Sequence, residues 1–206
     1  MNLQKSRPAA LISWVLHPLW TPLYLFGILV SCNPYLHMQP AVSWYMGVVL
    51  IVSVLASIAS LLMMQRSRGI SDLEVSERKE RFAPFAVVLL YQGLALWTLT
   101  GLPAYIPAGW IALLTAQMVL LAVALLITMR FKASMHMMGI TGAFGVLIFF
   151  NRQHALGLDA MLPLGFLLAG CVAWARLRIG VHSVPEVLVG SLLGLFGMPI
   201  LLGILL

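Results

Sequence analysis

Seven apolar segments run through the chain, and most of them approach the ~20 residues that a helix needs to cross the hydrocarbon core of a bilayer. Hydrophobic residues occupy 62% of the 206 positions and charged residues 9%, whereas soluble domains are roughly 45–50% apolar. The sequence therefore predicts an all-α fold, a polytopic transmembrane helical bundle of about six to seven spans. The segments cover approximately residues 10–32, 41–64, 84–101, 109–130, 134–150, 158–175 and 184–205.

No hydrophilic stretch is long enough to form a second soluble domain, so we predict that residues 1–206 form a single integral membrane domain. The first apolar segment follows Lys5 and Arg7, as in a signal peptide, but it has no clear small-residue cleavage site. It also contains Pro18 and Pro22. We expect this segment to be retained as the first span, either kinked or partly re-entrant.

Segment 65–83 is the substantial polar loop, and it carries five of the twelve Lys and Arg residues. If the spans alternate in direction, eleven of the twelve lie on one face, and only Arg152 lies opposite. The positive-inside rule then predicts that this face is cytoplasmic. Because the basic residues lie beside apolar segments, the net charge of +6 favours an anionic lipid surface or phosphate as the partner, and not nucleic acid. Cys32 and Cys171 are far apart and form no disulfide or metal-binding pattern.

The same alternation brings three helix starts to the charged face, near Pro84, Ser134 and Pro185. A helix N-terminus offers unpaired N–H groups and a partial positive charge, both of which favour an anion such as phosphate. A cluster of polar residues lies at each start. The clusters are Arg78–Pro84, Lys132–His136 and Arg176–Glu186.

The third cluster combines three side chains with complementary chemistry. Five residues separate Arg176 from His182, and three separate His182 from Glu186. A guanidinium holds an anion, an imidazole acts as a nucleophile or as an acid and base, and a carboxylate orients that imidazole. Charges are costly at membrane depth, so this concentration indicates a functional site.

In their order along the chain, the clusters resemble the three-part signature of the type 2 phosphatidic acid phosphatase superfamily, whose members include lipid phosphatases and vanadium haloperoxidases. That signature is usually written Lys-x6-Arg-Pro, Pro-Ser-Gly-His and Ser-Arg-x5-His-x3-Asp. The third part keeps the family spacing, with Ala175 in place of Ser and Glu186 in place of Asp. The second part keeps Ser134 and His136.

The first part departs most from the signature, because Glu74 stands where the family has Lys and Pro84 lies three residues beyond Arg81. Lys79 and Arg81 are the closest functional equivalents of the Lys and Arg of the signature, and Arg78 is the alternative. The resemblance covers a phosphatase-like core of approximately residues 72–200. Two apolar segments separate the first part from the second, so the chain would belong to a divergent branch.

The resemblance implies a metal-independent phosphatase, without a cofactor, that hydrolyses a lipid phosphate monoester or pyrophosphate. His182 would attack phosphorus to form a phosphohistidine, Glu186 would orient His182, and His136 would protonate the leaving oxygen. Members of the family usually work at the outer or lumenal face, in contrast to the cytoplasmic face predicted from charge. The phosphate oxygens would be bound by Arg176, Arg81, Lys79 and Ser134.

Structural roles compete with these functional ones. The third cluster could be an ion-paired group that anchors a helix end, Ser134 a helix cap and His136 a packed interfacial histidine, while Lys79 and Arg81 could be topology charges. The chain could then be a catalytically degenerate relative that binds phospholipid head groups or a membrane partner. A small transporter is disfavoured, because no internal repeat is visible. His17 has no partner nearby in sequence, and nothing in the sequence specifies an oligomeric state.

Overall fold

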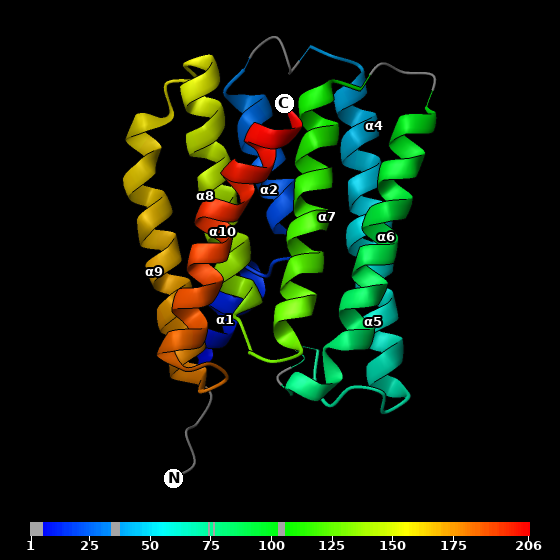
Figure 1. Cartoon of the computed structure of the whole chain (residues 1–206), viewed down its shortest axis with the longest axis vertical. Helices are drawn as coiled ribbons and strands as arrows, with labels where there is room; N and C mark the ends of the chain where they lie inside the picture. Colours follow the sequence, from blue (N-terminus) through cyan, green and yellow to red (C-terminus); the bar gives the residue numbers. More distant parts are fainter. Residues whose placement is uncertain (1–5, 34–37, 74, 76, 103–105) are drawn as a thin grey trace. The chain divides into compact units, whose positions relative to one another are not determined.

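The structure, a computed structural model, describes residues 6–33, 38–73, 75, 77–102 and 106–206, and all the secondary structure in these ranges is helical (Figure 1). Lys5 and Glu74 lie outside the described residues. The chain packs as two compact units. Unit 1 comprises Met1–Pro34 with Ala133–Gly203, and unit 2 comprises Tyr35–Lys132 with Ile204–Leu206.

Unit 1 is a bundle in which α9 packs against both α1 and α8, and α2 packs against α8. Figure 1 shows α8 in yellow-green beside α9 in amber. Helix α10 approaches α8 closely through glycines, since a Cβ on Gly194 would meet the backbone carbonyl of Met138. The helices of this unit are α1 (Arg7–Val15), α2 (Thr21–Ser31), α8 (Met135–His154), η3 (Leu158–Met161), α9 (Leu162–Ile179) and α10 (Val184–Leu205).

The first apolar segment, expected over residues 10–32 as a span that is kinked or partly re-entrant, contains two helices. Helix α1 ends at Val15 and α2 begins at Thr21. Pro18 causes the break, because proline lacks an N–H donor and disfavours helical geometry in the residue before it. Pro22 is tolerated, because it lies in the first turn of α2.

Unit 2 contains a long helical segment made of α4 (Ala41–Val48), the π-helical η1 (Val49–Leu55) and α5 (Ala56–Arg66), followed by η2 (Arg78–Glu80), α6 (Phe82–Gly101) and α7 (Ala108–Thr128). Helix α6 packs along α7 and against η1 and α5. Hydroxyl groups reinforce this packing, with Ser60 Oγ lying 3.0 Å from Tyr91 Oη. Tyr45 adds a ring contact with Trp110, at a centroid distance of 5.4 Å.

Within the described residues, five helices are long and apolar enough to cross a membrane. These are Ala41–Arg66, Arg78–Gly101, Ala108–Thr128, Leu158–Ile179 and Val184–Leu205. Large apolar side chains such as Leu90, Trp97 and Phe166 are exposed on these helices, which is costly in water but suits contact with lipid. The prediction of an all-α fold is confirmed for the described residues, and the five apolar helices support an integral membrane protein.

Candidate functional site

The third cluster lies where α9 ends and α10 begins. Arg176 is in the last turn of α9, and Gly180 ends that helix with a φ of +78° and an N–H bond of 3.1 Å to the Leu177 carbonyl. Glycine adopts this left-handed conformation without steric cost. The short turn that follows carries His182 to the start of α10, which begins at Val184.

His182 and Glu186 form a direct pair, with 2.9 Å between His182 Nδ1 and Glu186 Oε2. An ionised carboxylate only accepts hydrogen bonds, so Nδ1 carries the proton and the lone pair of the neutral ring is on Nε2. Glu186 also accepts a bond of 3.1 Å from the Ser183 N–H. That second bond is one half of a capping box, which fixes the carboxylate at the start of α10.

The second cluster meets the third through the backbone. Ser134 precedes the first residue of α8, and its N–H donates to the Glu186 carbonyl at 3.0 Å. A Cβ on Gly190 would collide with the Ser134 carbonyl, so the close approach of α8 and α10 requires glycine at this position. The Ser134 Oγ accepts a long bond of 3.5 Å from the Met137 N–H, which is a helix cap.

Arg176 and His136 both contact Ser13, in the last turn of α1. Arg176 Nη1 donates to Ser13 Oγ at 3.3 Å, and His136 Nε2 lies 3.1 Å from the Ser13 carbonyl oxygen. The last carbonyls of a helix have no intrahelical donor, so the His136 N–H supplies one here. All three residues are buried, with exposed fractions of 1% for Arg176, 3% for His136 and 1% for Ser13.

His17 joins the same group from the break between α1 and α2. Its ring contacts the His136 ring edge-on, with 4.9 Å between centroids, and its Nδ1 accepts a bond of 3.3 Å from the Leu19 N–H. Sequence reasoning gave His17 no partner and did not single out Ser13. A signal was present, because both are polar residues within an apolar segment, and His17 directly precedes the proline that interrupts it.

The structure therefore brings Ser134, His136, Arg176, His182 and Glu186 together within unit 1. Lys79 and Arg81, the residues of the first predicted cluster, belong to unit 2. Arg81 is buried, and its Nε donates to the Val75 carbonyl at 3.1 Å, which holds the polar loop at the start of α6. Lys79 is exposed in η2.

No group of three or more His, Cys, Asp or Glu side chains arranged to hold a metal ion is found among the described residues. Comparisons of the chain with protein-family models, with curated proteins and with solved structures found no match. No family membership follows from them, so the likeness to the phosphatase signature stays a prediction from the sequence.

Proposed function

We propose that this chain is a metal-independent membrane phosphatase that hydrolyses a lipid phosphate monoester or pyrophosphate through a phosphohistidine on His182. The His182–Glu186 pair at 2.9 Å carries the proposal. A nucleophilic imidazole needs a partner that holds its other nitrogen and stabilises the charge that develops during attack. Glutamate meets that need here even though the family signature has aspartate.

In the first step, His182 Nε2 attacks phosphorus, an N–P bond forms, and the P–O bond to the leaving group breaks. His136 supplies the proton that the leaving oxygen takes up. Because His136 Nε2 already contacts the Ser13 carbonyl at 3.1 Å, the proton for the leaving oxygen would come from Nδ1, the other nitrogen of the ring. Water then attacks phosphorus and gives a proton back to His136, the N–P bond breaks, and phosphate leaves with His182 restored.

The phosphate oxygens would be held by Arg176 and by the start of α8 at Ser134. A guanidinium presents several N–H donors in a fixed plane and suits this contact. The role of Lys79 and Arg81 in binding the same phosphate stays a sequence prediction. Because the His182 side chain is only 2% exposed, phosphate reaches Nε2 only when the groups that cover this side chain move.

The lipid tails would remain in the bilayer while the head group enters from the charged face. We propose six or seven spans, by adding α8, which is 20 residues long, and the segment made of α1 and α2 to the five helices above. The distribution of Lys and Arg favours a site on the cytoplasmic face, whereas members of the phosphatase superfamily usually work at the external or lumenal face. Cysteine labelling of loop 65–83 in sealed vesicles decides between them, because the loop reacts only with reagent on its own side.

The test is phosphate release from phosphatidate and from an isoprenoid pyrophosphate in mixed micelles. His182→Ala should abolish release, whereas His154→Ala, which removes an exposed histidine at the far end of α8, should leave it unchanged. Substrate labelled in its terminal phosphate should transfer label to the wild-type chain and not to His182→Ala. Full activity in His182→Ala would disprove the mechanism.

A second candidate function is binding of phospholipid head groups without turnover. The observation that favours it is that Arg176 and His136, the proposed phosphate ligand and acid, both bond to Ser13. These contacts are also what a purely structural polar cluster would make. Phosphatidate binding without label on His182 and without phosphate release would support this candidate and exclude the phosphatase.

A further inference from the structure

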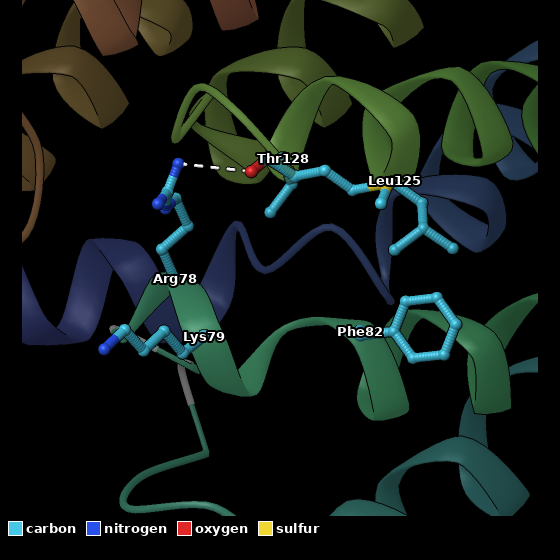
Figure 2. A pocket seen from close by; sticks show the side chains of 6 residues that line it. Arg78, Lys79, Phe82, Leu125 and Thr128 are labelled. Carbon is cyan, nitrogen blue, oxygen red and sulfur yellow. Dashed lines mark hydrogen bonds between the residues drawn. The ribbon is translucent and has the colours of Figure 1, made fainter.

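A cleft of about 250 Å³ lies within unit 2, where α6 begins and α7 ends. Figure 2 shows Arg78, Lys79 and Phe82 along one side of it and Leu125 and Thr128 on the α7 side. Met129 completes the lining. The cleft thus combines two cations with an apolar wall.

The cationic side is organised by Arg78. Its Nη1 donates to the carbonyls of Met129 at 3.3 Å and of Arg130 at 2.7 Å, just beyond the end of α7. These bonds offset the partial negative charge at a helix C-terminus, which would otherwise repel an anion. Glu80 binds elsewhere, because its Oε2 accepts two bonds of 2.8 Å from the Ser71 N–H and Oγ. The described residues that line the cleft include two cations and no acid, so positive charge predominates there.

Thr128 supplies an independent sign of a ligand. It is only 3% exposed and lines the cleft, and among the described residues its Oγ1 has no hydrogen-bond partner. A buried hydroxyl normally has a partner, because leaving it without one costs roughly 1–3 kcal/mol. An anionic oxygen in the cleft would accept a hydrogen bond from the Thr128 hydroxyl.

The apolar side suits an acyl chain. The side chains of Phe82, at the start of α6, and of Met129, just after α7, are 62% and 66% exposed. Leu125 of α7 lines the cleft together with these two residues. Cations beside exposed apolar side chains at the end of a spanning helix match the boundary between head groups and acyl chains in a leaflet. A soluble anion would leave this apolar wall without a partner.

We propose that this cleft binds one anionic phospholipid. Its phosphate contacts Lys79 and the Thr128 hydroxyl within the field of Arg78, and one acyl chain lies along Phe82, Leu125 and Met129. All the residues of this site belong to unit 2, and lipid binding there does not depend on phosphatase activity.

The test uses the full-length chain in neutral detergent, titrated with phosphatidylglycerol or phosphatidylcholine, with bound lipid counted by native mass spectrometry. Lys79→Gln should weaken the first phosphatidylglycerol binding step about fivefold, as expected for one interfacial cation. Thr128→Val should weaken it by about the same factor through the lost hydrogen bond. Arg66→Gln, an equal change of charge at an exposed arginine ending α5, should have no effect on this step.

Thermal unfolding in phosphatidylcholine nanodiscs checks that the variants fold. Thr128→Val should unfold no earlier than wild type, because it removes a hydroxyl without a partner. Added phosphatidylglycerol should stabilise wild type more than either cleft variant. Equal weakening by Lys79→Gln and Arg66→Gln would overturn the proposal in favour of non-specific attraction, and displacement of the lipid by millimolar glycerol phosphate would show that the site takes a free phosphate ester.

Discussion

Replacing Glu186 by glutamine tests the proposed chemistry with little change of shape. The carboxylate contacts His182 Nδ1 at 2.9 Å and accepts a bond of 3.1 Å from the Ser183 N–H, both through Oε2. The glutamine carbonyl can take the place of that oxygen, so the start of α10 is preserved. What disappears is the negative charge that fixes the tautomer of His182 and stabilises its cation.

We expect Glu186→Gln to lower kcat by about 10²- to 10⁴-fold, the range for losing a positioned acid–base group. The loss of stability should be small, about 0.3–1 kcal/mol for a negative charge at a helix N-terminus. Phosphate release from phosphatidate gives the rate, and thermal unfolding in the same micelles gives the stability.

Glu186→Asp provides the sharper comparison, because the family signature has aspartate at this position. The shorter side chain withdraws the carboxylate by about one C–C bond, roughly 1.5 Å, so the contact with His182 should open. We expect a loss of rate between those of wild type and Glu186→Gln. A rate for Glu186→Gln within about threefold of wild type, with folding intact, lies far below the acid–base range and would refute the argument that Glu186 positions the nucleophile.

Three further substitutions test the packing around the two sites. Gly190→Ala should destabilise the chain by about 1–3 kcal/mol through overpacking, because its methyl group would meet the Ser134 carbonyl; thermal unfolding against wild type measures this. Ser13→Ala should raise KM more than it lowers kcat, because Arg176 loses the hydroxyl that positions it, and Ser13→Thr should restore KM; unchanged kinetics would exclude this role. Arg78→Gln should make loop 65–83 more susceptible to trypsin, since the bonds to the end of α7 are lost, and an unchanged digestion pattern would contradict it.

Much of the fold could be predicted from hydropathy alone. The predicted segments 109–130 and 184–205 correspond to α7 at Ala108–Thr128 and α10 at Val184–Leu205. This works because a chain in lipid must pair its own backbone groups, so each long apolar run becomes a helix. In the first segment hydropathy alone does not register the N–H group that Pro18 lacks, and it is the prolines that predicted a kinked or partly re-entrant segment.

The third cluster could be found in the sequence because its members are close along the chain. His182 and Glu186 are four residues apart, and the turn at Gly180 brings Arg176 to the same end of the bundle. Spacing of this kind is visible in a sequence motif. Helix starts such as Ser134 are visible too, because a cap residue precedes an apolar run.

Ser13 could not be found in this way, because its partners are distant in sequence. The bond to His136 spans 123 residues and the bond to Arg176 spans 163 residues. Those contacts depend on α1 ending against α9, and α1 ends there because Pro18 interrupts the segment after His17. The same break leaves the Ser13 carbonyl without a helical donor, and His136 supplies one. The break at Pro18, which would weaken a continuous spanning helix, thus places Ser13 where it holds the buried His136 and Arg176.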